Sequence, residues 1–476
     1  MPQNKKQNFA IIGAGMGGTL MGIYLASRGF QVDIFERRAD MRRHPVEPGR
    51  SINMTLAARG LHALAKAGLH DVVMAMTVPL RGRMVHAENG TVTAQPYGKN
   101  DTEVHHSIKR SQLNITLINY AESFPSLRLF FNQRCISVKR ETGLLRLYDE
   151  ESGRVRHVTA GVIIGADGAF STVREEMQRD QPADFYQEYL PEGYKELAIP
   201  PDAVGNYQLD EKSLHVWPRG AMVLIAIPNA DGSFTCTLTL PYQGEFSFAS
   251  LKTPSAVRGY FQRFYPEVLS LAPGIPTEFL SHPPGKYLTT KTCPWYYKGG
   301  VVLIGDACHS VLPFYGQGMN AAFEDCVVLA DCLDSEPGDT EAAFVKYQHL
   351  RKRNTDALAD LSIRNYFELR EKVRSPLFVA RKNLEIKLTR AFPNLYVPLY
   401  SLVTHTTTPY ADAVERCMRQ DRLLRLMGLD AVLPVLAAPA LFAQWRKRFS
   451  RWADIQSRRL PGAAERAADA AGAAKS

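Results

Sequence analysis

Short apolar runs that end in glycine turns organise the N-terminal part of the chain. Residues 9–12 are apolar and lead into Gly13-Ala-Gly-Met-Gly-Gly18, after which apolar residues recur at helical spacing until Gly29. A second apolar run, residues 31–35, ends at Glu36. The order of strand, glycine turn, helix and strand predicts a βαβ unit at the start of the chain.

Two similar strand-and-glycine breaks occur much later, at Val162-Ile-Ile-Gly-Ala-Asp-Gly168 and Val301-Val-Leu-Ile-Gly-Asp-Ala307. Continuous apolar runs of this kind are typical of strands buried on both faces of a largely parallel sheet. Between them, residues 214–217, 222–227 and 234–240 are β-rich segments separated by proline and glycine turns, which predicts antiparallel hairpins. From about Glu341 onward the apolar spacing is helical.

These patterns predict an α/β protein in which a Rossmann-like cofactor domain is interrupted by an antiparallel β-sheet domain and followed by a helical region. We expect the cofactor domain to comprise residues 1–75, 100–180 and 290–370, and the β-sheet domain to comprise residues 76–99 and 181–289. The helical region would cover residues 371–460, and the alanine-rich residues 461–476 are expected to be disordered. A length of 476 residues fits more than one domain.

The chain has a net charge of +9 and a pI of about 9.1, but the excess is local. Residues 444–476 contain eight Lys or Arg and three Asp or Glu. Basic and aromatic residues are not interleaved along the rest of the chain, which argues against a nucleic-acid groove. Residues 439–459 form a basic amphipathic pattern, which is compatible with peripheral contact to an anionic membrane or with packing on the protein itself, and we favour packing.

The seven cysteines are scattered, without a CxxC pair or zinc-ligand spacing. This pattern predicts reduced thiols and no metal site. The polar N-terminal residues 1–8 precede a strand and do not resemble a signal peptide. We therefore expect a cytoplasmic protein.

The glycine turn carries the first candidate chemistry. Gly13, Gly15 and Gly18 form a GxGxxG pattern between a strand and a helix, and Glu36 follows at the end of the next strand. Such glycines let backbone N–H groups approach a pyrophosphate, and such an acid accepts hydrogen bonds from ribose hydroxyls. The pattern predicts a dinucleotide site that includes Glu36 and its neighbour Arg37.

Later motifs resemble those of the aromatic hydroxylase class of flavoproteins, which have a GR2-type FAD-binding fold. Gly305-Asp-Ala-Cys-His309 with Pro313 and Gly316-Gln-Gly-Met-Asn320 resembles the GD motif of that class, and Gly165-Ala-Asp-Gly168 with Ser171 and Arg174 resembles its DG motif. The resemblance implies tightly bound FAD and transient binding of NADPH. It assigns cofactor contacts to Arg110, Asp167, Asp306, Gly316, Gln317, Gly318, Met319 and Asn320.

Further segments resemble the kynurenine 3-monooxygenases within this class, up to about Tyr410. They are Gly49-Arg-Ser-Ile-Asn53, Leu80-Arg-Gly-Arg-Met-Val-His86, Gln95-Pro-Tyr-Gly98, Gly193-Tyr-Lys-Glu-Leu197, His215-Val-Trp-Pro218, Ser233-Phe-Thr-Cys-Thr-Leu238 and Pro313-Phe-Tyr-Gly-Gln-Gly-Met-Asn320. The resemblance implies hydroxylation of L-kynurenine by NADPH and O2 through a flavin hydroperoxide. The protein would hold the ring and exclude water, and no protein side chain would act as the catalyst.

The same resemblance assigns substrate contacts. Arg83 and Tyr97 would hold the amino-acid carboxylate, while Asn365, Tyr400, Phe314, Ile225 and Thr239 would line the rest of the pocket. Two positions depart from the family pattern: Thr239 stands where phenylalanine is usual, and Tyr315 stands where histidine or phenylalanine is usual. A smaller, polar Thr239 predicts a larger ring pocket.

The sequence leaves two alternatives open. The chain could hydroxylate another aromatic substrate, which Thr239 favours, or it could be a non-catalytic flavoprotein that binds a partner through its basic tail. Three histidines invite a catalytic role, but we interpret His309 as structural and find no partner for His105 or His106 in the sequence.

Overall fold

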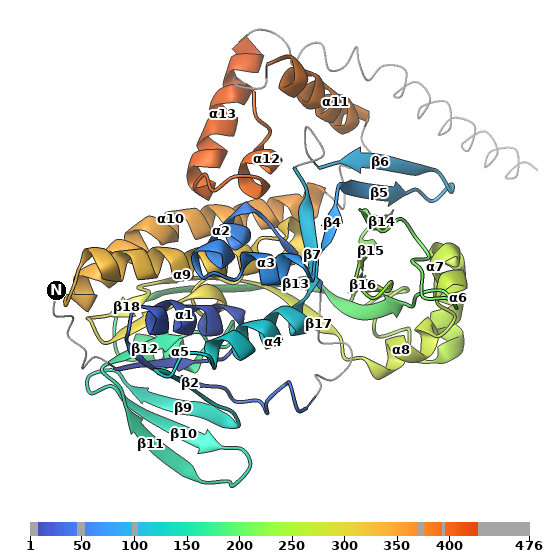
Figure 1. The fold of residues 1–476 in the computed structure, drawn as a ribbon. Helices are drawn as coiled ribbons and strands as arrows, with labels where there is room; N and C mark the ends of the chain where they lie inside the picture. The colour runs from blue at the N-terminus through green and yellow to red at the C-terminus, as the bar shows by residue number, and fades with distance from the viewer. Residues whose placement is uncertain (1–7, 45–52, 98–102, 369–375, 393–395, 427–476) are drawn as a thin grey trace, which may run out of the picture. The chain divides into compact units, whose positions relative to one another are not determined.

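The computed structural model describes residues 8–44, 53–97, 103–368, 376–392 and 396–426. It divides into two compact units, residues 1–371 with 397–416 and residues 372–396 with 417–476. The first unit contains the four sheets of the described chain (Figure 1). The predicted fold class is confirmed, because a largely parallel sheet, antiparallel sheets and C-terminal helices are all present.

A six-stranded sheet forms the centre of the cofactor-binding part. In spatial order its strands are β18 (Tyr296–Tyr297), β19 (Val301–Leu303), β12 (Val162–Gly165), β1 (Asn8–Ile12), β2 (Gln31–Phe35) and β8 (Leu127–Phe130). All neighbours are parallel except β18 and β19. The three apolar runs predicted as buried parallel strands are β1, β12 and β19, and they lie side by side.

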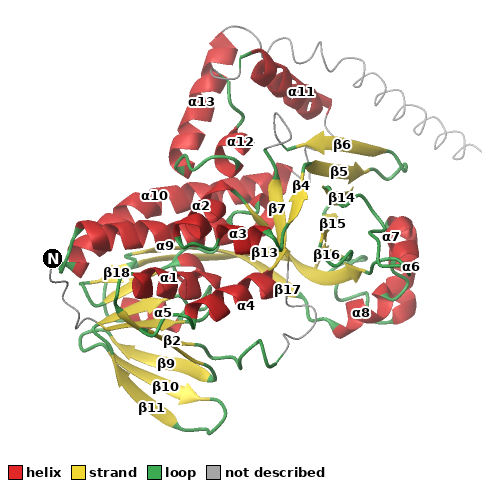
Figure 2. Cartoon of the chain, viewed as in Figure 1, coloured by secondary structure: helices red, strands yellow, loops and turns green. Residues whose placement is uncertain are grey.

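Helices pack on this sheet and on one another (Figure 2). They are α1 (Met16–Ser27), α2 (Ala58–Lys66), α3 (His70–Met74), α4 (Arg110–Ala121), α5 (Thr172–Gln178), α9 (Gly318–Ser335) and α10 (Thr340–Phe367). Residues 18–26 of α1 are all buried, since this helix lies between β2, α4 and α9. This packing fixes the N-terminus of α1 directly after the glycine turn.

A seven-stranded sheet forms the second large layer. In spatial order its strands are β17 (Gly285–Cys293), β13 (Asp184–Ile199), β16 (Phe234–Pro241), β15 (Met222–Pro228), β14 (Ser213–Arg219), β5 (Gly82–His86) and β6 (Val92–Pro96). The predicted hairpins are β14, β15 and β16, which pair antiparallel. A separate core joins this sheet to α6 (Pro254–Phe264), α7 (Pro266–Leu271) and α8 (Ile275–Ser281).

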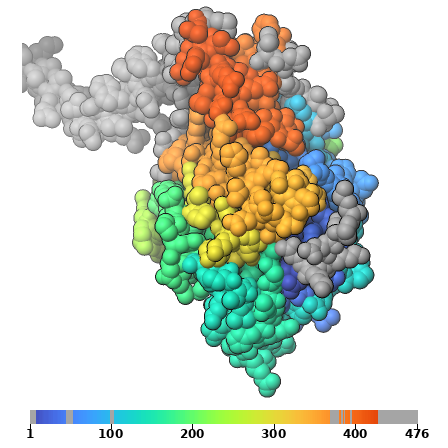
Figure 3. Space-filling view, turned by 90° about the vertical axis from the view of Figure 1, so that its left-hand side faces the viewer, coloured from blue at the N-terminus to red at the C-terminus, as the bar shows by residue number. Residues whose placement is uncertain are grey.

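Two small sheets complete the first unit. One contains β9 (Gln133–Lys139), β10 (Leu144–Asp149) and β11 (Val155–Thr159), and it projects from the six-stranded sheet (Figure 1). In the space-filling view this part of the chain is the green-to-teal region at the bottom (Figure 3). The other contains β3 (Asn53–Leu56), β7 (His105–Lys109) and β4 (Val78–Leu80). Strand β7 leads straight into α4, so it carries residues toward the cofactor-binding part.

The remaining elements are short turns and late helices. They are η1 (Gly305–Ala307), η2 (Pro313–Tyr315), α11 (Pro376–Ala391), α12 (Leu399–Thr404) and α13 (Tyr410–Leu426). Helix α12 belongs to the first unit, while α11 lies in the second, where Arg381 pairs with Asp421. In the described part of the chain, no helix is long and apolar enough to span a membrane. The predicted amphipathic segment 439–459 and the predicted disordered tail 461–476 lie outside the described residues.

Candidate active site

The glycine turn after β1 leaves space where a ligand can approach the backbone. Gly13 has a φ of +107°, and a Cβ atom there would collide with the backbone of Ala166. A Cβ atom on Gly18 would overlap the carbonyl oxygen of Gly13. A Cβ atom on Gly15 would meet no protein atom within 4 Å. Two glycines are thus required by the turn itself, and the third faces open space at the N-terminus of α1, as a bound pyrophosphate requires.

Glu36 closes the same turn from the end of β2. Its carboxylate accepts hydrogen bonds from the backbone N–H of Ala14 (2.9 Å) and of Arg38 (3.0 Å), and it is half-buried. A carboxylate has about four acceptor positions, so both oxygens keep capacity for ribose hydroxyls. The neighbouring Arg37 is exposed.

Asp306 stands out in the first half of the GD motif because its neighbours on both sides are buried. Of the ten residues 301–310, nine are buried and only Asp306 is exposed. Desolvation by the surrounding protein raises the pKa of the Asp306 carboxyl, and the nearby Arg110 guanidinium opposes that effect. Arg110 is itself exposed, in the first turn of α4. An exposed carboxylate and an exposed guanidinium therefore lie close enough to interact electrostatically, which suits the hydroxyls and the diphosphate of FAD.

The DG motif is joined to the GD motif by hydrogen bonds. The Ser171 hydroxyl donates to the Asp167 carboxylate at 2.5 Å, while burial raises the pKa of that carboxyl. The Arg174 guanidinium donates to the carbonyl oxygens of Ala169 and Ala307, each at 2.8 Å. The two motifs, more than a hundred residues apart in sequence, therefore hold each other in place.

The loop from Gly316 to Asn320 is held by its polar side chains. Gly316 has a φ of +65°, which favours glycine. The Asn320 amide donates to the carbonyl oxygens of Thr55 and Gly316, both at 2.9 Å, and the Gln317 carbonyl accepts from the Tyr410 hydroxyl at 3.0 Å. The side chains of Gln317 and Asn320 thus shape the loop, so contact with a cofactor would come from the loop backbone. Gly318 opens α9, and Met319 packs on the main core.

His309 belongs to a buried charge network and is not exposed beside Asp306. Its Nε2 atom lies 2.5 Å from the Asp325 carboxylate, which also accepts hydrogen bonds from Arg351 (2.7 Å) and from the backbone N–H of Gly305 (2.9 Å). Cys308 lies close enough to complete a metal-ligand set. Burial raises the pKa of its thiol well above the ordinary value, and Asp325 is already engaged by other donors, so the set suits a structural network better than a metal.

The residues predicted to hold a carboxylate lie together. Arg83 in β5 donates from Nε to the Gln95 side chain at 2.7 Å, and its positive charge opposes the rise in the pKa of Tyr97 and Tyr400 that burial causes. The rings of Tyr97 and Tyr400 are stacked with centroids 5.6 Å apart. Burial raises the pKa of Tyr97 to about 12 and the pKa of Tyr400 well above its ordinary value, so both phenols keep their hydrogen at neutral pH. This carboxylate cluster, defined as Arg83, Tyr97 and Tyr400, has one cation and two neutral donors.

His105 contacts the carboxylate cluster, which the sequence did not indicate. Its Nε2 atom lies 2.9 Å from the Tyr400 hydroxyl oxygen, so the expectation that His105 lacks a partner is wrong. Its neighbour His106 lies near the Thr77 hydroxyl at 3.4 Å. No motif indicated the His105 contact because its two residues are 295 positions apart.

Acid should destabilise this fold through its buried imidazoles. Burial lowers the pKa of His105, His106, His215 and His405, in the case of His105 from 6.5 to about 3. Below pH 6.5 these histidines bind protons in the unfolded chain but stay neutral in the folded chain. The free energy of unfolding therefore decreases as pH falls from 6.5 toward 3. For His105 alone the loss at pH 5.5 is about 1.4 kcal/mol.

The measurement is urea unfolding of the protein and of His105→Gln at pH 7.5 and at pH 5.5. The variant should lose less stability between these two pH values than the unaltered chain. An identical loss in both proteins would contradict the assigned pKa of His105.

Aromatic rings form a second cluster next to the loop from Gly316 to Asn320. Phe314 lies 4.9 Å from the Tyr366 ring and 5.0 Å from the Tyr287 ring, measured between centroids. The Asn365 amide donates to the Phe314 carbonyl oxygen at 2.7 Å, and Tyr315 reaches the Tyr400 ring at 5.8 Å. We call Phe314, Tyr366 and Tyr287 the ring cluster. The neighbouring loop residues Phe314 and Tyr315 therefore connect the ring cluster with the carboxylate cluster.

Thr239 is fully engaged inside the protein. Its hydroxyl lies 2.9 Å from the Tyr287 hydroxyl, and its exposed fraction is 2%. Ile225 is half-buried on the same face of the sheet, because Val223 pairs with Thr239 and Ile225 pairs with Thr237. The Tyr287 phenol reaches the hydroxyl of Thr239, so Tyr287 is a pocket candidate that sequence reasoning missed.

We expect Thr239→Val to lower the free energy of unfolding by about 1–3 kcal/mol, because the buried Tyr287 hydroxyl loses its partner. Removing both hydroxyls in Thr239→Val with Tyr287→Phe should return stability close to that of the unaltered protein. Urea unfolding at neutral pH measures both. A double variant that is less stable than Thr239→Val would show that the pair is not an isolated hydrogen bond.

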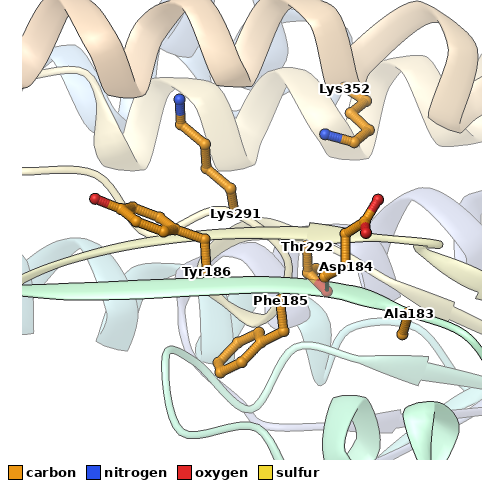
Figure 4. Close-up of a pocket in the computed structure, with 7 residues that line it drawn as sticks. All are labelled: Ala183, Asp184, Phe185, Tyr186, Lys291, Thr292 and Lys352. Atoms are coloured by element: carbon orange, nitrogen blue, oxygen red, sulfur yellow. Dashed lines mark hydrogen bonds between the residues drawn. The ribbon is translucent and has the colours of Figure 1, made fainter.

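A separate hollow of about 390 Å³ lies at the edge of β13 and β17, near α10 (Figure 4). Its lysines are engaged, Lys291 with Asp360 at 2.5 Å and Lys352 with Asp356 at 2.6 Å. None of the predicted site residues lines it. The surroundings of Asp306 and the two clusters, and not this hollow, are the candidate active site.

The sequence matches the FAD-binding domain family over residues 6–189 and 287–360, and the gap between the two segments contains β14–β16 and α6–α8. The chain is 46% identical over 446 residues to the kynurenine 3-monooxygenase of Salinispora tropica, covering 93% of this chain and 98% of that protein. This chain belongs to the kynurenine 3-monooxygenase family. The Myxococcus xanthus member of the family is 42% identical and covers 86% of this chain and 88% of its own length. The prediction of an FAD-dependent monooxygenase is confirmed.

Solved structures of other flavoprotein oxygenases share the fold. A tetrameric form of 2-methyl-3-hydroxypyridine-5-carboxylic acid oxygenase superposes with a TM-score of 0.64 at 21% identity, over 78% of this chain and 95% of that one. Pseudomonas aeruginosa PqsL in complex with 2-aminobenzoylacetate gives a TM-score of 0.61 at 20% identity, over 77% and 97%. At this identity the likeness supports the fold alone.

Proposed function

We propose that this chain hydroxylates L-kynurenine to 3-hydroxykynurenine, with NADPH as electron donor and O2 as oxygen source. The observation that carries the proposal is the carboxylate cluster of Arg83, Tyr97 and Tyr400. A guanidinium binds a carboxylate through two N–H groups, and two neutral phenols add donors without adding charge. An amino-acid carboxylate at this point satisfies the cluster.

The aromatic part of the substrate would pack against the ring cluster. Phe314 supplies a face, and the Asn365 amide fixes the backbone of that residue by its hydrogen bond to the carbonyl oxygen. Two residues further on, Gly316 begins the loop assigned to the flavin. A substrate whose carboxylate is held by Arg83 and whose ring lies against Phe314 is therefore presented toward the cofactor.

The residues of the chain bind and orient, and they do not need to remove a proton from the substrate. FAD, when bound beside Asp306, supplies the redox chemistry that uses NADPH and O2. The aniline nitrogen of kynurenine activates its own ring toward oxygen transfer. Tyr97 and Tyr287 keep their hydrogens, because burial raises the pKa of both above the ordinary value of 10. Their chemistry is donation, positioning and exclusion of water.

A second candidate is a hydroxylase of another aromatic substrate on the same scaffold. It is favoured by Thr239, whose hydroxyl binds Tyr287 where the family pattern has an apolar ring. Such a substrate would still carry a carboxylate, since the carboxylate cluster is unaffected by this difference. A non-catalytic flavoprotein has no use for either cluster.

The test is NADPH oxidation by FAD-loaded protein with L-kynurenine, with anthranilate and with no aromatic compound. Stimulation by L-kynurenine together with formation of 3-hydroxykynurenine supports the proposal. Stimulation by anthranilate alone would favour the second candidate. Stimulation by L-kynurenine without a hydroxylated product would overturn the proposal and identify L-kynurenine as an effector.

A further inference from the structure

The side chain of His105 lies where the carboxylate cluster meets strand β7. It is 4% exposed, and its Nε2 atom is 2.9 Å from the hydroxyl oxygen of Tyr400. Its ring also meets the Tyr97 ring edge to face, with centroids 4.7 Å apart, and the His405 ring lies at 5.2 Å. His105 thus contacts both phenols of the cluster.

The imidazole of His105 is uncharged at neutral pH. Burial lowers its pKa to about 3, and the neighbouring His405 and His106 contribute to the lowering. A neutral imidazole carries one N–H and one lone pair. Among the described residues, Nδ1 of His105 has no hydrogen-bond partner, whereas Nε2 faces Tyr400.

We propose that His105 is a positioning residue that donates its Nε2 hydrogen to the hydroxyl oxygen of Tyr400, which leaves the phenol hydrogen of Tyr400 free to bind the substrate carboxylate. The inference rests on the proposed function, which places a carboxylate at this cluster. A buried N–H without a partner is rarer than a buried acceptor without one, which favours the hydrogen on Nε2 over Nδ1. In the opposite tautomer the Tyr400 hydroxyl would donate to His105 and could not also donate to the carboxylate.

The phenol hydrogen remains available to a ligand. Tyr400 is half-buried, so part of its side chain is open, and burial keeps its pKa well above the ordinary value. With its oxygen occupied by His105, the hydroxyl has one preferred direction before the substrate arrives. Such preorganisation lowers the cost of ordering the site on binding.

The test compares His105→Phe, which keeps a ring but removes the donor, with His105→Gln, which keeps an N–H donor near the position of Nε2. Binding of L-kynurenine to the oxidised, FAD-loaded protein is followed by flavin absorbance, and NADPH-dependent turnover gives KM and kcat. We expect His105→Phe to raise Kd and KM about tenfold with kcat within about twofold. His105→Gln should restore most of the affinity.

Two controls separate positioning from general damage. In a Tyr400→Phe background, His105→Phe should have no further effect on Kd, because His105 acts through the Tyr400 hydroxyl. His106→Phe changes the next residue of β7, whose side chain points to the opposite face of the strand, and should leave Kd unchanged. The decarboxylated analogue of L-kynurenine should bind the unaltered protein and His105→Phe equally.

Each contrary result has a defined meaning. Equal weakening of the decarboxylated analogue, a full additional loss in the Tyr400→Phe background, or no rescue by His105→Gln would overturn the role of His105. If the unaltered protein binds L-kynurenine without hydroxylating it, the proposed function fails while the inference is still measured by Kd. If it binds no L-kynurenine, both fail.

Discussion

Replacing Arg83 with methionine is expected to raise the KM for L-kynurenine about 30- to 1,000-fold, which corresponds to a loss of about 2–4 kcal/mol. The guanidinium is the only cation in the carboxylate cluster, and it sits beside two phenols that keep their hydrogens. Without it, the substrate carboxylate is held by neutral donors alone. The value of kcat should change much less, because Arg83 binds a part of the substrate that does not react.

Two further variants make this result specific. Arg83→Lys keeps the charge but loses the planar pair of donors, so its KM should lie between those of the unaltered protein and Arg83→Met. Arg81 is an exposed arginine two residues earlier, and Arg81→Met is the matched control with an expected change below about twofold. Steady-state kinetics with varied L-kynurenine measures all three. An effect of Arg81→Met as large as that of Arg83→Met would contradict the assignment of the carboxylate cluster.

Two alanine substitutions in the glycine turn are expected to have different effects. Gly18→Ala should lower the stability of the protein, whereas Gly15→Ala should lower its affinity for FAD. In Gly18→Ala the added Cβ would overlap the Gly13 carbonyl oxygen, so the turn must distort and the FAD-free protein should lose about 3 kcal/mol or more. In Gly15→Ala the backbone conformation, with φ of −68° and ψ of 173°, accepts any residue and the Cβ meets no protein atom. The FAD-free Gly15→Ala variant should therefore have the same melting temperature as the unaltered FAD-free protein.

Gly15→Ala should instead weaken FAD binding about 10- to 100-fold, because the methyl group occupies the space through which the backbone approaches the diphosphate. Fluorescence titration of the FAD-free protein gives this affinity, and thermal melting of the same samples gives the stability. Normal FAD affinity in Gly15→Ala would contradict the placement of the cofactor at this turn.

Sequence reasoning succeeded where a local pattern determines the structure. The apolar runs of β1, β12 and β19 are buried on both faces and can only form an inner sheet, and the glycines of the first turn fix its backbone. The antiparallel pairing of β14, β15 and β16 follows in the same way from hairpin turns between apolar strands.

The remaining features depend on contacts between distant segments, which no local pattern encodes. Tyr287 meets Thr239 across 48 positions, and His105 meets Tyr400 across 295 positions. Helical spacing after Glu341 also could not indicate that α12 packs in the first unit while α11 does not. The roles of Gln317 and Asn320 became clear only from their hydrogen bonds, which shape the loop from Gly316 to Asn320.

The most direct test of the proposed function is hydroxylation of L-kynurenine under 18O2, with FAD-loaded protein and NADPH, and with the product analysed by mass spectrometry. The proposed function predicts 3-hydroxykynurenine that carries one 18O atom on the ring, formed in proportion to the NADPH consumed. NADPH consumption that yields only hydrogen peroxide, or a product without 18O, would contradict it.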